Sequence, residues 1–433
     1  MKPKQTHIKK DSPFAIFIWA LYDFANTIYS MNVVSLYFPL LITVNLGFPD
    51  IWVSVANSVS MAIVVISMPF FGAFSDKIGR RMPFLTGFTL LAIFFTFLIG
   101  FFMKLSLPPN ILLILICGAF VIANFGYQGG LVFYNTLLSR VASCKKRGSI
   151  SGFGVAFGYL GSILGMLLVL PFNEGRIFSL DIPFIHAGGR QATFLPTAIL
   201  FLIFAIPTLI YFREKKRLSK PPSYEREQPS LKLIWQTITN PKKYPGMGRF
   251  LLANFFYNDG VQTAIIFMAV FARKIMGLSD GAVTGFLIFS TVGAFAGSII
   301  IGKISDRIGH KKALSFVLLG WIASLFILAA FPISTVLWIL GIPIGALLGG
   351  VWTCARPIVL HLSPVGDEGR YFGLYAFSGK LAAIVGPLVW GGITLSISPI
   401  SENLAYRVAL LSLAGLIGIG AWLLKGLQIP ERV

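Results

Sequence analysis

The chain has 433 residues, of which 56% are hydrophobic and only 12% are charged. Soluble domains usually contain about 25% charged residues, so this composition excludes a soluble protein and indicates an integral membrane protein. The formal net charge of +20 would suit a nucleic-acid-binding protein, but its distribution along the chain points to a membrane instead.

A transmembrane helix needs about 20 predominantly apolar residues to cross a hydrocarbon core of about 30 Å. Twelve runs in the sequence meet this requirement, and they predict twelve transmembrane helices. The runs cover residues 14–44, 51–74, 83–103, 110–138, 150–171, 193–212, 250–273, 281–301, 313–331, 335–361, 371–395 and 404–424. The hydrophilic stretch between the sixth and seventh runs predicts an N-terminal six-helix bundle (1–212), a central cytoplasmic loop (213–249) and a C-terminal six-helix bundle (250–433).

Lysine and arginine are unevenly distributed over the predicted loops. If the N-terminus is cytoplasmic, 28 of the 36 basic residues lie in cytoplasmic segments and only six in outer segments. This bias is the positive-inside pattern, so both termini are predicted to be cytoplasmic in a multi-pass protein of the plasma membrane. Anionic membrane lipid is therefore the expected partner of the basic loops, and no nucleic-acid partner is expected.

Sequence features of enzymes are missing from the chain. The three cysteines follow neither a disulfide nor a metal-ligand spacing. The sequence contains no histidine-rich metal set, no serine nucleophile motif and no Walker loop. We therefore expect no catalytic residue, no metal, no cofactor and no ATP hydrolysis by this chain.

A ten-residue segment occurs twice in the chain. Residues 72–81 read GAFSDKIGRR and residues 302–311 read GKISDRIGHK. Each copy lies between two long apolar runs, and the neighbouring elements keep the same order and direction. The chain therefore consists of two parallel copies of one membrane unit, which is typical of transporters.

The repeated segments predict a conformational latch at the cytoplasmic ends of the helices. Their glycines permit a sharp turn, and their aspartates suit the positive end of a neighbouring helix. Arg140 is the predicted counter-charge of Asp76, whereas His361 holds the matching position near Asp306, which predicts a weaker lock in the second half. A plain polar turn is the alternative. The predicted latch residues are Gly72, Asp76, Gly79, Arg80, Arg81, Arg140, Gly302, Asp306, Gly309, Lys311 and His361.

Ionisable residues within the predicted spans mark a central cavity. Asp23, Asp259 and Lys380 each lie nine residues from the cytoplasmic end of a span, roughly 14 Å deep at 1.5 Å per residue. A charge that faces lipid at this depth costs at least ~2.5–3.5 kcal/mol, so these residues, with Arg356 at a shallower depth, should face a cavity or form buried ion pairs. The predicted cavity residues are Tyr22, Asp23, Asn26, Asn124, Gln128, Asn135, Asn258, Asp259, Gln262, Arg356 and Lys380.

Glycines in the fifth span form a stripe of small residues. Gly154, Gly158, Gly161 and Gly165 are spaced so that they share one side of a helix. Small residues allow helices to approach closely. We expect this stripe to lie at the moving interface between the two bundles.

Several segments resemble known transporter families. Residues 72–81 resemble the signature loop between helices 2 and 3 of the major facilitator superfamily. Residues 22–30 (YDFANTIYS), 257–263 (YNDGVQT) and 372–388 (FGLYAFSGKLAAIVGPL) resemble the subfamily that includes the autophagy-related vacuolar amino-acid effluxers and their bacterial homologues. The resemblance implies an all-α major facilitator fold, with two six-helix bundles related by a pseudo-two-fold axis along the membrane normal.

These features together predict a secondary active or facilitative transporter of a small polar solute. It would work as a monomer by rocker-switch alternating access, with an amino acid or related zwitterion as solute, exported from the cell. Asp23 and Asp259 would hold the cationic end or a coupled proton or cation, and Arg356 would hold the carboxylate. Pro357 lacks an N–H and crowds the preceding turn, which affects where Arg356 is placed. A sugar or organic-anion symporter or exporter, and a lipid-translocating or non-transporting receptor, remain as alternatives.

Overall fold

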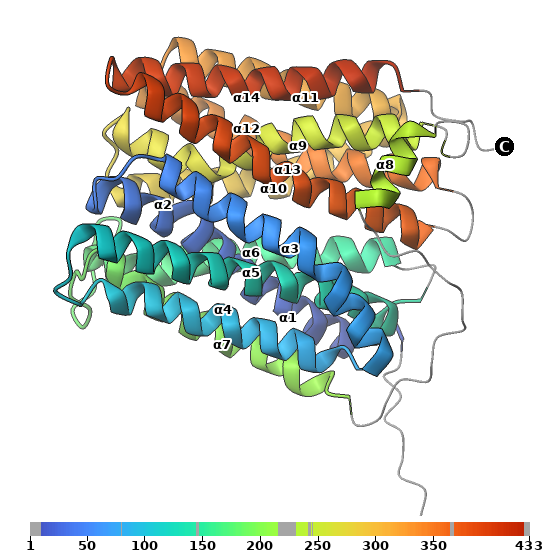
Figure 1. Ribbon diagram of the computed structural model, residues 1–433, viewed down its shortest axis with the longest axis horizontal. Coiled ribbons are helices and arrows are strands. Elements are labelled where there is room, and N and C mark those ends of the chain that lie inside the picture. The colour runs from blue at the N-terminus through green and yellow to red at the C-terminus, as the bar shows by residue number, and fades with distance from the viewer. Residues whose placement is uncertain are drawn as a thin grey trace, which may run out of the picture.

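The computed structural model describes residues 10–78, 80–143, 147–214, 231–240, 244, 246–363 and 368–427. Within these residues, twelve helical segments are long and apolar enough to cross a membrane. Their number and order confirm the predicted all-α membrane fold. They pack into two bundles, which in Figure 1 are the lower, blue-to-green N-terminal half and the upper, yellow-to-red C-terminal half.

The N-terminal half begins with one long interrupted span and continues with five further spans. Its helical elements are α1 (Pro13–Tyr29), η1 (Ser30–Tyr37), α2 (Phe38–Leu40), η2 (Leu41–Asn45), α3 (Ile51–Ile78), α4 (Met82–Phe102), α5 (Pro109–Val141), α6 (Arg147–Glu174), η3 (Arg190–Thr193) and α7 (Phe194–Tyr211). A two-stranded antiparallel hairpin, β1 (Arg176–Ile177) and β2 (Leu180–Asp181), follows α6, and Arg176 pairs with Asp181.

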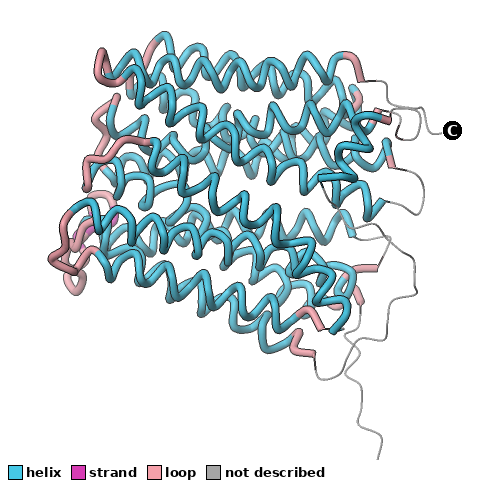
Figure 2. The backbone as a smooth tube through the Cα atoms, in the orientation of Figure 1, coloured by secondary structure: helices cyan, strands magenta, loops and turns pink. Residues whose placement is uncertain are grey.

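The C-terminal half begins after a short helix that lies between the two halves in the sequence. The elements are α8 (Leu231–Thr239), α9 (Met247–Lys274), α10 (Asp280–Ile308), α11 (His310–Ala330), α12 (Ser334–Leu362), α13 (Glu368–Ile397) and α14 (Glu402–Lys425). The loops gather at the two ends of the helices (Figure 2). We call the end with the α3–α4 and α10–α11 connections the repeat end, and the other, with the connection that contains Asp50, the Asp50 end.

The first span is irregular in the part nearest the Asp50 end. Ser30–Tyr37 and Leu41–Asn45 are π-helical, and Phe38 donates its N–H to the carbonyl of Val33, five residues earlier. Pro39 has no N–H, and in a regular α-helix its ring would clash with the carbonyl four residues before it. The wider π turns on either side accommodate this proline, and such turns are frequent near functional sites.

Aromatic side chains fill the interior of both halves. Tyr22 and Tyr29 are fully buried in the N-terminal half, and Trp321 and Trp390 in the C-terminal half. Large apolar side chains such as Phe70 also remain exposed on the outside of the helices. An exposed apolar exterior is what a helix bundle in contact with lipid tails requires.

The glycine stripe of α6 lies within the N-terminal half, and its predicted position between the two halves is wrong. Gly161 lies directly against the backbone of Phe24 on α1, and Gly165 lies against Ile28. A Cβ atom at Gly165 would come within 2.9 Å of the Ile28 side chain. The stripe therefore holds α1 and α6 together and fixes the position of the Asp23 side chain on α1.

Candidate functional site

Two oppositely charged side chains from different halves act on each other across the interior. Asp23 on α1 and Arg356 on α12 are both half-buried. Within the described residues, neither side chain forms a hydrogen bond or a direct ion pair, but the two charges attract each other electrostatically. The pair thus consists of a hydrogen-bond acceptor from the N-terminal half and a donor from the C-terminal half.

Aromatic rings form the wall beside Asp23. The Tyr134 ring stacks on Trp19 and on Tyr22, with both centroid distances at 4.9 Å. On the other side a Cβ atom at Gly158 would lie 3.6 Å from Asp23 Oδ2, so the glycine leaves room for the carboxylate. The three rings are buried and stacked on one another, so they form a rigid wall beside the carboxylate.

Lys380 makes a polar contact between the halves near the middle of the helices. Its Nζ lies 3.2 Å from Gln128 Oε1 and 3.5 Å from the Gln128 carbonyl oxygen. Gln128 belongs to α5 and Lys380 to α13. Within the described residues, Lys380 therefore pairs with Gln128 and forms no direct ion pair.

Asp259 was predicted to line the cavity with Asp23 and Lys380, but its side chain lies inside the C-terminal half. It is fully buried between α9 and α13, and its Oδ1 accepts a hydrogen bond of 2.7 Å from the Gly386 N–H. Asp23 and Lys380 therefore interact with side chains of the opposite half, whereas Asp259 contacts its own half.

Two other predicted cavity residues belong to helix–helix contacts. The Tyr22 hydroxyl is buried at 2.7 Å from Thr89 Oγ1. Asn124 donates to Ser60 Oγ at 2.6 Å and to Asn57 Oδ1 at 3.4 Å. Both residues stabilise the packing of the N-terminal half. Of the remaining predicted residues, Asn26 and Asn258 are buried, Gln262 is half-buried and Asn135 is exposed.

The predicted latch residue Arg140 pairs with Glu214 among the described residues. Its Nη1 lies 3.2 Å from Glu214 Oε1, and the Glu214 side chain is only 3% exposed. Glu214 also accepts hydrogen bonds from the N–H groups of Arg81 and Met82, at 2.7 and 3.1 Å, and so caps the start of α4. The Asp76 side chain and Gly79 lie outside the described residues, so the role of Asp76 stays a prediction.

The second copy of the predicted latch also makes contacts within its own half. Lys311 Nζ donates to the carbonyl oxygens of Lys425 and Leu427, at 2.8 and 2.7 Å. His361 Nδ1 lies 2.8 Å from the Pro357 carbonyl oxygen, and Asp306 is exposed. The remaining residues of the predicted latch that the structure describes are Gly72, Arg80 and Gly302, which are half-buried, and Gly309, which is exposed with a φ of +91°.

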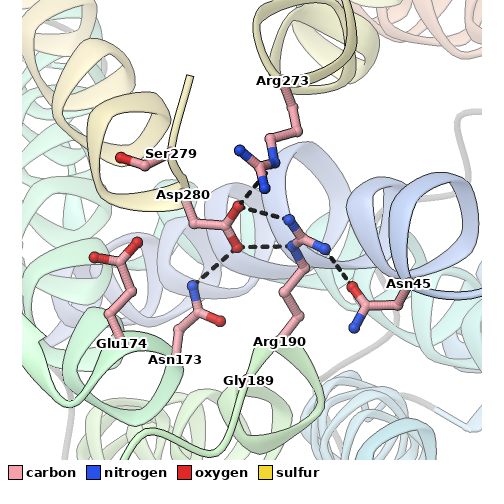
Figure 3. A pocket seen from close by; sticks show the side chains of 8 residues that line it. All are labelled: Asn45, Asn173, Glu174, Gly189, Arg190, Arg273, Ser279 and Asp280. Carbon is pink, nitrogen blue, oxygen red and sulfur yellow. Dashed lines mark hydrogen bonds and ion pairs between the residues drawn. The ribbon is translucent and has the colours of Figure 1, made fainter. Parts of the chain in front are cut away.

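A polar pocket of about 280 Å³ lies where the two halves meet at the Asp50 end (Figure 3). At its centre, the Asp280 carboxylate accepts hydrogen bonds of 2.7 and 2.6 Å from Arg190 Nε and Nη2. Asn173 donates to the same carboxylate at 3.0 Å, and Arg273 lies 3.6 Å away. Arg190 also contacts Asn45. Charges of both signs thus join α6 and η3 of one half to α9 and α10 of the other.

A second cluster at the same end is centred on Asp50, between η2 and α3. The buried Asp50 carboxylate accepts hydrogen bonds from Trp390 Nε1 at 3.1 Å and from the Tyr406 hydroxyl at 2.9 Å. Lys274 Nζ lies 3.5 Å away. Burial raises the pKa of the Asp50 carboxyl above its ordinary value, and the Lys274 charge and the two hydrogen bonds offset part of this rise.

The contact of α3 with α13 continues this junction along the helices. Asn57 Nδ2 donates to the Ala383 carbonyl oxygen at 3.1 Å, and Ser58 Oγ donates to the Ile384 carbonyl oxygen at 2.7 Å. Together with the two aspartate clusters, these bonds hold the halves together at the Asp50 end. Sequence reasoning missed Asp50, Arg190 and Asp280, because each is a single charged residue at the edge of an apolar run, where a solvated loop charge is equally expected.

Comparison with known proteins identifies the group of sequences that this chain resembles. The family described as "Vacuole effluxer Atg22 like" matches residues 52–430. An uncharacterised transporter of the major facilitator type from Bacillus subtilis, YxiO, is 26% identical over 411 residues, which cover 92% of each chain. The multidrug resistance protein MdtG of Escherichia coli is 25% identical over 402 residues, which cover 88% of this chain and 86% of MdtG.

Solved transporter structures share the fold. A variant of the nucleoside transporter NupG has a TM-score of 0.72 and 15% identity, with 95% of this chain and 99% of that chain covered. A bacterial homologue of the human lysosomal transporter Spinster, in an inward-facing and unoccupied conformation, has a TM-score of 0.71 and 14% identity, with 95% of each chain covered. At these identities the likeness shows the major facilitator fold alone.

Proposed function

Because the chain belongs to the family of Atg22-like vacuole effluxers and has the major facilitator fold, we propose that it moves a small zwitterion by alternating access. The proposed solute is an amino acid or a close relative. One observation carries this proposal: Asp23 and Arg356 attract each other from opposite halves, and neither side chain has a hydrogen bond or direct ion pair within the described residues.

A zwitterion complements these two side chains. Its ammonium group would bind the Asp23 carboxylate. Its carboxylate would bind Arg356, since the planar guanidinium fork suits two parallel hydrogen bonds to a carboxylate. A solute held in this way contacts both halves at once, so its binding favours their closure around it.

We further propose that both termini are cytoplasmic in the plasma membrane, as the distribution of basic residues indicates. The Asp50 end then faces outward, and the bonds between the halves close the transporter to the outside. Transport in the efflux direction would separate Asp50 from Tyr406 and Asp280 from Arg190, while the repeat end closes. The binding of the solute between the halves would compensate for the bonds that are lost.

Counterflow in proteoliposomes tests the solute class. Purified protein is loaded with unlabelled solute and exchanged against labelled amino acids, sugars and organic anions in parallel. Amino acids should exchange, and Asp23→Asn and Arg356→Lys should each reduce this exchange. Asp181→Asn and Arg176→Lys, two exposed positions of the hairpin, are matched controls that should exchange like the wild type. Exchange of a sugar or an organic anion, with none for amino acids, would contradict the proposal.

Thiol labelling tests the orientation. In a variant without Cys117, Cys144 and Cys354, either Ser106→Cys or Asn240→Cys is introduced. Both positions are exposed, Ser106 at the Asp50 end and Asn240 at the repeat end. A membrane-impermeant reagent added to intact cells should label the Ser106→Cys variant and spare the Asn240→Cys variant. The reverse result would invert the topology.

A further inference from the structure

Asp259 is a buried carboxyl group that the solute site described above does not use. The side chain is fully buried, and its Oδ1 accepts the Gly386 N–H at 2.7 Å. Its other oxygen, Oδ2, has no hydrogen-bond partner in the described part of the chain. Thr263 Oγ1, one turn further along α9, is buried and equally without a partner there, and it lies against the same glycine.

Among the residues that the structure describes, no positively charged side chain pairs with Asp259. The elements packed against α9 present several charged or titratable side chains, namely Lys380 and Tyr375 on α13, Arg356 on α12, Tyr37 on η1, and Tyr406 and Arg407 on α14. Among the described residues, none of them forms a hydrogen bond or ion pair with the Asp259 side chain, and the Gly386 N–H is its polar contact. An ionised carboxylate in such a place loses its hydration and gains no partner charge, which costs several kcal/mol.

The contact depends on a residue without a side chain. A Cβ atom at Gly386 would overlap Asp259 Oδ1 and Thr263 Oγ1, so only glycine lets α13 approach the carboxyl group this closely. The same arrangement recurs in the N-terminal half, where Asp23 and Thr27 on α1 face Gly158 of α6. The two copies differ in exposure, because Asp23 is half-buried and Asp259 is fully buried.

We propose that Asp259 is the binding site of the coupled ion, that this ion is a proton, and that the site is separate from the solute site at Asp23 and Arg356. The inference rests on the proposed transport function. In the state described here Asp259 is protonated: Oδ1 accepts the Gly386 N–H, and the proton sits on Oδ2. Loss of the proton leaves a charge that only one N–H contacts, which favours separation of α13 from α9 and entry of water. Protonation thus stabilises the state that is closed at the Asp50 end.

Infrared spectroscopy of the purified protein tests the protonation without any solute. The spectrum of the wild type at neutral pH, minus that of Asp259→Asn, should show the C=O stretching band of a protonated carboxylic acid. The Asp181→Asn variant removes an exposed carboxyl group and should instead remove the bands of an ionised carboxylate. A difference spectrum for Asp259→Asn that shows only carboxylate bands would overturn the proposal.

Transport in proteoliposomes tests the coupling, with a mixture of labelled neutral amino acids as the probe. The wild type should accumulate the probe above equilibrium when a pH gradient is imposed. Asn is isosteric with a protonated aspartate and still accepts the Gly386 N–H, so Asp259→Asn should fold and keep counterflow but lose the accumulation. Accumulation by Asp259→Asn equal to that of the wild type would show that the residue is structural and would overturn the inference.

A third variant separates this inference from the proposed function. Asp23→Asn should reduce counterflow itself, whereas Asp259→Asn should leave counterflow intact. If the wild type moves no amino acid in either assay, the proposed solute is wrong, and the infrared result alone then decides whether Asp259 holds a proton.

Discussion

Arg190 and Asp280 are joined across the two halves by two parallel hydrogen bonds, in which Nε and Nη2 lie 2.7 and 2.6 Å from the two carboxylate oxygens. Both side chains are about nine-tenths buried. The attraction between the charges offsets their loss of hydration only while both partners are present. Loss of either partner should therefore weaken the closed Asp50 end strongly, whereas loss of one partner of a solvated surface pair would have little effect.

Removal of one partner of this pair should destabilise the closed state. In Asp280→Asn the Arg190 charge stays buried without its counter-charge, which should cost about 3–5 kcal/mol. The charge reversal Arg190→Asp with Asp280→Arg should recover part of this loss. Thermal unfolding in detergent measures stability, and the distance between spin labels on the two halves at the Asp50 end measures opening. A single variant with wild-type stability and distances would contradict the assigned role.

Asp50 should make stability depend on pH. Burial raises its pKa above the ordinary value of 3.8, so the folded protein binds this proton more tightly than the unfolded chain does. The stabilisation is complete below the ordinary value and is lost as the pH rises through the raised pKa. The stability of the wild type relative to Asp50→Asn should therefore fall across this window in thermal unfolding at stepped pH. A constant difference would show that the carboxyl group titrates normally.

Two glycines of α5 offer a matched test of helix packing. A Cβ atom at Gly126 would lie 2.7 Å from the Phe88 carbonyl oxygen and 2.8 Å from the Ala92 nitrogen, whereas at Gly118 nothing lies within 4 Å. Gly126→Ala should lower stability by about 1–3 kcal/mol through overpacking. Gly118→Ala should be neutral or gain about 0.5–1 kcal/mol, since glycine weakens a helix interior. Equal melting temperatures for the two variants would argue against the close approach of α4 to α5.

Glu214 should stabilise the repeat end of the N-terminal half. Its carboxylate accepts the N–H groups of Arg81 and Met82 and pairs with Arg140. Glu214→Ala leaves these donors without their acceptor, which should cost about 1–3 kcal/mol. Glu214→Gln retains an oxygen acceptor for the N–H groups and loses only the charge, so its stability should lie between those of Ala and the wild type. The reverse order in thermal unfolding would rule out a capping role.

The twelve-helix architecture could be predicted from the sequence because it depends on features that are local in the chain. Apolar runs of span length and the repeat of residues 72–81 at 302–311 require no knowledge of distant contacts. The prediction that Asp23 and Arg356 line a solute cavity stays a prediction. Sequence reasoning failed for the Tyr22 hydroxyl, which turns toward Thr89, because a polar position on a helix does not reveal which neighbouring helix it faces.

The junction at the Asp50 end could not be predicted in this way. Asp50 and Tyr406 are separated by 356 residues in the sequence, and Arg190 and Asp280 by 90. Neither pair lies in a recurring motif, and a charged residue at the edge of an apolar run is usual in any membrane protein. Only the packing of the two halves shows that these charges are buried together.

The hydrogen bonds between α3 and α13 require particular side chains on α3 but not on α13. Asn57 and Ser58 must keep side chains that donate, whereas Ala383 and Ile384 contribute only carbonyl oxygens of the main chain, which every residue type supplies. Random mutagenesis followed by selection for transport should therefore tolerate varied side chains at 383 and 384 while rejecting most changes at 57 and 58. Where the two repeats meet, the sequence of α13 can therefore change faster than that of α3.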